Sequence, residues 1–181
     1  MAQSNAGRYQ PARTLTIDPR IRRIGFAYFE GAILDEWGIR NVRNDEPEVR
    51  VQRLLIPVLV GMLDRHAPTV LLVPDVRFGA VKRSEKVGEV IVGVVREALN
   101  RGIAVKFISD AEVKTAFESA VGSPRPNKQR INETIVKWFP ELERWLPKKR
   151  KLWHPERYAQ PLFQSVAMYC AWMGIPKRDS G

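Results

Sequence analysis

The chain has 181 residues, 44% of them hydrophobic, so it is long enough to fold as one domain with a hydrophobic core. Its charge is unusual, because 30 Lys and Arg against 20 Asp and Glu give a net charge of +10 and a pI near 10.1, which favours a nucleic-acid partner over a basic surface kept for solubility. The single cysteine, Cys170, excludes an internal disulfide and suits a reducing, cytoplasmic compartment. Two histidines without a second cysteine indicate no zinc site, and no apolar run reaches membrane-spanning length, which argues against a membrane partner.

The first part of the chain predicts a basic arm and a three-stranded meander. Residues 1–13 are polar and are expected to form a flexible arm. Alternating apolar and β-branched residues, with Gly31 as a turn residue, predict strands over residues 14–18, 24–30 and 32–40. The first two strands form a hairpin, and Asp18 lies at its mouth, directly before Pro19.

Helices and strands alternate after this meander. Apolar residues at helical spacing predict helices over residues 47–66 and 82–101, and short apolar runs predict strands over 69–73 and 103–108. Three further helices are expected. The first runs from a cap at Ser109 or Asp110 to about residue 120, and the others cover residues 128–139 and 155–173, with 174–181 as a tail. The order predicts one α/β domain over residues 14–173, with a mixed five-stranded sheet and helices on both faces.

Two carboxylates follow predicted strands directly. Asp18 ends the first strand, and Asp75 comes after the buried strand that closes at Pro74. A carboxylate at the mouth of a sheet is well placed to hold a divalent cation. An Asp next to a Pro is more often a turn residue, so both interpretations stay open from the local pattern alone.

The residues and the element order together resemble the RuvC-type Holliday junction resolvases, which have the ribonuclease H-like fold. Ile17-Asp18-Pro19 followed by Gly25 is similar to the opening signature of that family, and the strand at residues 70–75 resembles its second acidic strand. The segments 112–114, 121–123 and 127–128 resemble the part in which two lysines and a glycine-containing loop face DNA. The resemblance covers most of residues 14–173.

The resemblance implies hydrolysis of a phosphodiester by two magnesium ions, which four clustered carboxylates hold. The sequence departs from that pattern near the strands. Arg20 replaces the first glycine of the opening signature and puts a bulky cation beside Asp18. Pro74 stands where the second acid is expected, and Asp75 comes one residue later, which would point its side chain to the opposite face unless Pro74 distorts the backbone.

The last predicted helix departs further. Pro161 and Gln164 stand where the resemblance implies two acids. Glu156, Gln160 and Gln164 are spaced by four and share a face if the helix begins by Pro155, so Glu156 is a candidate third anion; a solvated helix start is the alternative. We therefore expect the two-metal site to be broken. If the protein is active, Asp18, Asp75 and Glu156 are the candidate catalytic residues, and Asp18 and Asp75 the candidate ligands of Mg²⁺ or Mn²⁺.

Basic residues gather in four clusters around the predicted cleft, which fits a groove that follows a phosphate backbone. The candidate DNA-binding residues are Arg20, Arg22, Arg23, Lys82, Arg83, Lys86, Lys114, Arg125, Lys128 and Arg130, and the fourth cluster is the run Lys148 to Lys151.

Three hypotheses follow. The first is a RuvC-like protein that binds branched or distorted DNA and has lost or weakened its endonuclease activity. The second is an active structure-specific endonuclease with a rearranged metal site. The third is a basic scaffold that binds an acidic protein partner. For the first two, the resemblance implies a homodimer.

Overall fold

The computed structural model describes residues 12–42, 48–76, 85–146 and 158–174. Its core is one sheet in the order β3-β2-β1-β4-β5. The first three strands pair antiparallel, whereas β1 with β4 and β4 with β5 pair parallel. The mixed five-stranded sheet predicted from the sequence is confirmed. Its strands are β1 (Arg13–Pro19), β2 (Arg23–Glu30), β3 (Ile33–Asn41), β4 (Val70–Pro74) and β5 (Ala104–Ile108).

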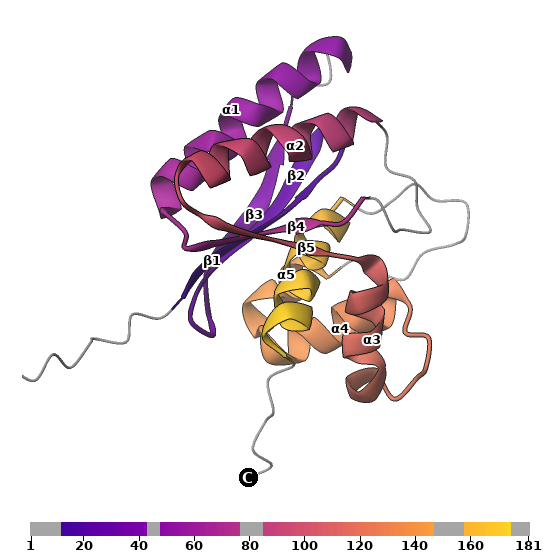
Figure 1. Ribbon diagram of the computed structural model, residues 1–181. Helices are drawn as coiled ribbons and strands as arrows, with labels where there is room; N and C mark the ends of the chain where they lie inside the picture. Colours follow the sequence, from indigo (N-terminus) through magenta and orange to yellow (C-terminus); the bar gives the residue numbers. More distant parts are fainter. Residues whose placement is uncertain (1–11, 43–47, 77–84, 147–157, 175–181) are drawn as a thin grey trace, which may run out of the picture.

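Helices cover both faces of this sheet, as Figure 1 shows. One face carries α1 (Glu48–His66) and α2 (Glu85–Asn100). The other carries α3 (Asp110–Val121), α4 (Lys128–Trp138), the 3-10 helix η1 (Pro140–Trp145) and α5 (Gln160–Met173). None of these helices has the length and apolarity that crossing a membrane requires, within the residues the structure describes.

The alternation of side chains along each strand builds two cores. Leu15 and Ile17 of β1 pack with α1 and α2, and Phe29 of β2 packs with α5. On β4, Leu71 belongs to the α1–α2 core and Leu72 to the α5 core. Successive residues of a strand therefore lie in turn on the α1–α2 side and on the α5 side of the sheet.

The helix α5 crosses the sheet over β1 and β2 (Figure 1). Its Tyr169 ring stacks on Phe29, with ring centroids 3.5 Å apart and planes 4° from parallel, and the Tyr169 hydroxyl donates to the Gly31 carbonyl. At the other end, Ser165 Oγ donates to the Gly25 carbonyl at 3.0 Å. These contacts fix the start of α5 over the end of β1.

The last helix begins later than the sequence predicts. It starts at Gln160, after a turn at Tyr158 and Ala159, instead of near Pro155. Pro161 suits the first turn of a helix, because its missing N–H would have no intrahelical acceptor there. The predicted helix start near Pro155, on which the shared face of Glu156, Gln160 and Gln164 depended, is therefore wrong. Glu156 itself lies outside the described residues.

Candidate nucleic-acid interface and acidic edge

Asp18 lies at the end of β1, on the face covered by α5. It is directly opposite Gly25 of β2, and a Cβ on Gly25 would meet the backbone of Pro161 and Leu162 in α5. Residues directly opposite in an antiparallel pair share a face, so Asp18 lies beneath the first turn of α5. Its exposed fraction is 0%. Asp18 therefore lies next to the first turn of α5, the part of the last helix where the resemblance implies acidic residues.

The carboxylate of Asp18 is paired with Arg20. The Nε and Nη2 atoms of Arg20 lie 2.9 and 2.8 Å from Asp18 Oδ2, and the Arg20 side chain is 20% exposed. The backbone N–H of Arg20 donates to the Arg23 carbonyl at 2.7 Å and closes the turn of the hairpin. This turn directs the guanidinium back onto the strand that carries Asp18.

Asp75 follows β4 at the same edge of the sheet. Thr16 is opposite Leu72, so two residues further along the register Asp18 is level with Pro74, one residue before Asp75. The Asp75 N–H donates to the Ile108 carbonyl at 2.9 Å, as the β4–β5 ladder requires, so Pro74 does not interrupt the strand geometry. The strand ends at Pro74, and Val76 packs in the same α1–α2 core as Val73, so the strict alternation of faces does not extend past Asp75.

The first turns of α5 carry amides that tie the helices together. Gln160 and Gln164 are both buried. Gln160 Oε1 accepts from Asn132 Nδ2 of α4 at 3.1 Å, and Gln164 Nε2 donates to Asp110 Oδ1 of α3 at 3.1 Å. Gln164, at the place of one implied acid, therefore makes a charge-assisted hydrogen bond between helices, and its neighbour Gln160 makes a neutral one.

Asp110 is a possible site residue that is not among those predicted from the sequence. The helix α3 begins after β5, with Ser109 as its N-cap in a capping box with Glu112, and Asp110 is its first residue. Asp18 therefore lies near the end of β1, while Asp75 and Asp110 follow β4 and β5, and these are three neighbouring parallel strands. The carboxyl ends of parallel strands meet at one edge of a sheet, and this repeated acid after a strand is the signal that could have identified Asp110.

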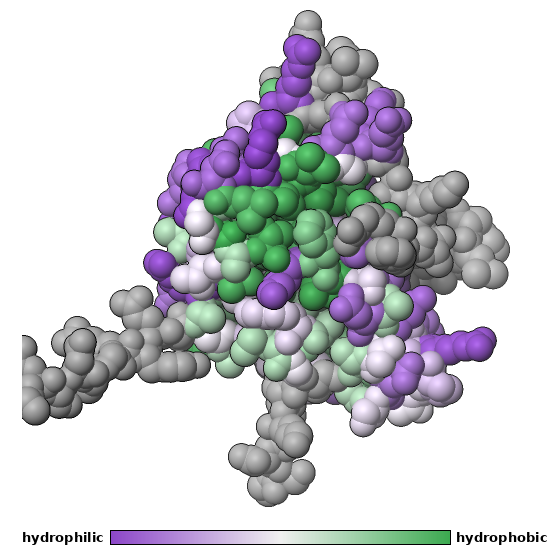
Figure 2. All heavy atoms as spheres, in the orientation of Figure 1, coloured by the Kyte–Doolittle hydropathy of each residue, from purple (hydrophilic) through white to green (hydrophobic). Residues whose placement is uncertain are grey.

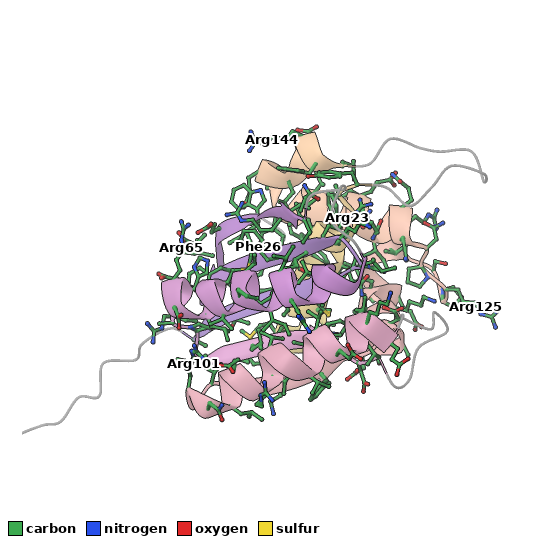
Figure 3. The ribbon with its side chains drawn as sticks, turned by 90° about the horizontal axis from the view of Figure 1, so that it is seen from above. Arg23, Phe26, Arg65, Arg101, Arg125 and Arg144 are labelled. Carbon is green, nitrogen blue, oxygen red and sulfur yellow. The ribbon has the colours of Figure 1, made fainter. Side chains whose placement is uncertain are left out.

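A groove of about 600 Å³ lies between α3, the start of α4 and the segment that joins them, and α5 contributes to its wall through Gln164. Three predicted DNA-binding residues line it, Lys114, Arg125 and Lys128, and all three are exposed. Asp110 also lines the groove, together with the basic residues and with Gln164 of α5. Figure 3 shows Arg125 at one end of the molecule and Arg65 and Arg101 at the other.

The other predicted DNA-binding residues lie around this edge or outside the described residues. Arg23 Nη1 donates to the Tyr158 carbonyl at 3.4 Å, with its guanidinium 5.5 Å from the Tyr158 ring centroid. Arg22 is in the hairpin turn, Lys86 at the start of α2, and Arg130, which is exposed, at the start of α4. The predicted residues Lys82 and Arg83 and the run Lys148 to Lys151 lie outside the described part of the chain.

The residues present do not fit the magnesium pair that the resemblance implies. In the described part of the chain, no group of three His, Cys, Asp or Glu side chains is placed to hold a metal ion. Asp18 is engaged by a guanidinium, and α5 presents a proline and an amide. Magnesium prefers several anionic oxygens, and this set supplies too few on one face.

The sheet order, the two helical layers and the position of Asp18 under α5 define the ribonuclease H-like fold of the RuvC type. Among solved structures, RuvC of Thermus thermophilus is similar over 89% of this chain and 96% of its own, with a TM-score of 0.61 and 19% identity. The T. thermophilus RuvC structure in complex with Holliday junction substrate matches 90% of this chain and 96% of its own, with a TM-score of 0.61 and 18% identity.

A third similar structure is the yeast mitochondrial Holliday junction resolvase Ydc2. It matches 93% of this chain and 82% of its own, with a TM-score of 0.60 and 13% identity. No protein-family profile and no curated protein sequence matches the chain. At these identities the likeness is one of fold, so the activity has to be argued from the residues of the site.

Proposed function

We propose that this protein binds branched or distorted DNA, such as a Holliday junction, and that its metal-dependent endonuclease activity is lost or weakened. The observation that carries the proposal is the groove lined by Lys114, Arg125 and Lys128 beside the start of α5. A solved structure of the same fold, RuvC of T. thermophilus, holds Holliday junction substrate.

The charge distribution supports a phosphate-binding role for this groove. Three exposed cations line it against two carboxylates, Asp110 and Glu118. Asp110 already accepts a hydrogen bond from Gln164, so part of its charge is taken up within the protein. Long basic side chains that contact phosphates position a duplex without reading its sequence, which suits recognition by shape.

Weak or absent cleavage follows from the set of donors. A two-metal mechanism needs carboxylates around both ions. On the α5 side of the sheet, Asp18 faces Arg20, and the helix offers Pro161 and Gln164. The opposite assignment is an endonuclease that uses Asp18 and Asp75, which lie at the same edge of the sheet, in an altered site.

A homodimer is the assembly that we infer for this function, with α2 and the edge strand β5 as the shared surface. Val92 and Leu99 of α2 are 69% and 59% exposed, and Phe107 of β5 is 42% exposed. Phe107 is in register with Val73, a residue of the α1–α2 core, so it lies on the α2 face. Figure 2 shows hydrophobic residues gathered over this part of the molecule. A second copy would cover a surface that is otherwise costly to expose.

Sedimentation tests this assembly. The wild-type chain is expected to sediment as a dimer at micromolar concentration, and Val92→Glu/Leu99→Glu as a folded monomer. Arg65→Gln, a change at the far end of α1, serves as the control and should stay dimeric. A wild-type monomer at these concentrations contradicts the proposed surface.

The function is tested on a synthetic four-way junction and the matching linear duplex. Binding is measured by gel shift in calcium, and cleavage in magnesium and in manganese, with Asp18→Asn as control. We expect selective binding of the junction without cleavage. Cleavage that Asp18→Asn and Asp75→Asn each abolish would instead establish an endonuclease. Absence of DNA binding, or binding insensitive to salt, would favour the scaffold with an acidic protein partner.

A further inference from the structure

We propose that the guanidinium of Arg20 occupies the cation position on Asp18, so that this end of β1 is charge-balanced without a divalent metal ion and contributes to DNA binding without one. The inference deepens the proposed function. The claim that Arg20 takes the cation position on Asp18 also holds if the protein does not bind DNA. This claim and the proposed function can therefore fail separately.

The burial of Asp18 makes a counter-charge necessary. The residue is wholly shielded from water, and a buried carboxylate is strongly disfavoured unless a cation or several donors compensate it. Two nitrogen atoms of Arg20 lie within 2.9 Å of its Oδ2. A guanidinium remains charged at any pH at which the protein is folded, so this cation is permanent, whereas a metal ion binds and dissociates.

The hairpin turn explains why the guanidinium reaches this position. Arg20 is two residues after Asp18, and its backbone N–H is held by the Arg23 carbonyl. The resemblance implies a glycine at this position, which has no side chain to compete with a metal ion for the carboxylate. Replacement of that glycine by arginine therefore adds a cation that competes with a metal ion for Oδ2 of the carboxylate.

The helix above the pair gives no support for an additional cation. Pro161 meets the backbone of Gly25, and Gln164 donates to Asp110, so neither adds negative charge near Asp18. Within the Arg20–Asp18 ion pair, the one positive charge of the guanidinium offsets the one negative charge of the carboxylate. A divalent ion added to that balanced pair would bring excess positive charge into a buried place.

The experiment measures the midpoint of thermal unfolding, Tm, against MnCl₂ at constant ionic strength, for wild type, Arg20→Gln, Asp18→Asn and the double variant Asp18→Asn/Arg20→Gln. Arg65→Gln is the matched control, because Arg65 also pairs with a carboxylate, Glu36, at 3.0 Å, but at the surface. The same proteins are titrated with the four-way junction in EDTA and in magnesium.

The wild-type Tm is expected to respond to manganese no more than that of Arg65→Gln. Arg20→Gln should lower Tm by roughly 10 °C in EDTA, because it leaves a buried charge unpaired. Manganese should then raise the Tm of this variant in a saturable way. The double variant should recover part of the loss and show no response to manganese, which keeps the test decisive even if Arg20→Gln alone fails to fold.

Two results overturn the inference. One is a saturable rise of the wild-type Tm with manganese that Asp18→Asn abolishes, since the metal would then displace Arg20. The other is an Arg20→Gln variant with unchanged Tm and no response to manganese. In the DNA titration, wild-type affinity should be equal within twofold in EDTA and in magnesium, and a gain of tenfold in magnesium contradicts the inference. Failure to bind DNA in any buffer contradicts the proposed function and leaves the Tm result standing.

Discussion

Gly25 of β2 and Pro161 of α5 touch through their backbones, since a Cβ on Gly25 would lie 2.1 Å from the Pro161 carbonyl carbon. Neither backbone can move without displacing a strand or a helix. Gly25→Ala is therefore expected to lower the free energy of unfolding by about 3 kcal/mol or more. Urea denaturation followed by circular dichroism measures this loss.

Gly88 in α2 provides the control for that substitution. An added Cβ there meets nothing within 4 Å, and alanine has the higher helix propensity. Gly88→Ala should stabilise the protein by up to about 1 kcal/mol. Equal effects of the two substitutions would show that α5 does not approach β2 as closely as described.

The hydrogen bond between Asp110 and Gln164 can be tested by moving the carboxylate from one partner to the other. Gln164→Glu places two carboxylates in contact and should destabilise the protein by about 1–3 kcal/mol at pH 7. Adding Asp110→Asn restores an amide opposite a carboxylate and should recover most of the loss. A double-mutant cycle from urea denaturation gives the coupling, and additive effects of the two changes would contradict a direct contact.

The groove predicts how DNA affinity depends on salt. Lys114→Gln/Arg125→Gln removes two of its cations and should reduce the slope of log K against log[salt] by about 2. The control is Arg65→Gln/Arg101→Gln, which removes two cations at the opposite end of the molecule, as Figure 3 shows. Fluorescence anisotropy from 50 to 300 mM salt measures both slopes. A larger reduction of the slope in the control would show that DNA does not bind at the groove.

His66 predicts a pH dependence of stability. Its side chain is 6% exposed and stacks on Tyr28, with ring centroids 4.4 Å apart. Burial lowers its pKa below the ordinary value of 6.5, and Glu36 opposes this shift in part. The unfolded chain therefore takes up the proton at a higher pH than the folded protein, so stability falls as the pH drops from about 6.5 through the lowered pKa.

His66→Gln removes this proton uptake. Its Tm should decline less steeply than that of wild type between pH 7 and pH 5, with carboxylates contributing equally to both curves. Parallel curves for the two proteins would mean that His66 does not titrate differently in the folded and unfolded states.

Cys170 is expected to be chemically inert in the native protein. Burial raises the pKa of its thiol to about 12, and its exposed fraction is 1%. A thiol-disulfide reagent at pH 8 needs an accessible thiolate, so labelling should be negligible until the chain is denatured and complete afterwards. Rapid labelling of the folded protein would indicate that α5 opens locally.

Periodicity and turn residues were sufficient to predict the sheet and most helices. The alternation before Asp18 gave β1 within one residue at each end, and Gly31 marked the hairpin between β2 and β3. These signals are local, so they are readable in one sequence. The start of α5 was placed too early, because the polar stripe that includes Glu156 has helical spacing while the turn at Tyr158 and Ala159 has no strong sequence signal.

The site was harder to predict than the fold because it depends on which residues meet across elements. The resemblance identified Asp18, Pro161 and Gln164; the structure places Asp18 beneath the first turn of α5, at Pro161, and pairs Gln164 with Asp110 instead. The sequence already placed the cation of Arg20 beside Asp18, two residues away, whereas Asp110 and Gln164 are 54 residues apart and meet only through tertiary geometry, which no spacing rule encodes. Whether Asp75 and the selected basic residues bind metal or DNA remains a prediction for the measurements above.

The contact between Ser165 and Gly25 spans 140 residues, so it forms only after α5 has been synthesised. All five strands precede α5, so a growing chain can pair its sheet while the face of Ala27, Phe29 and Leu72 still lacks its covering helix. Such an intermediate exposes apolar surface to chaperones and to other chains. The proposed DNA-binding groove also takes part of its wall from Gln164 of α5, so this wall is incomplete in a nascent chain that ends before α5.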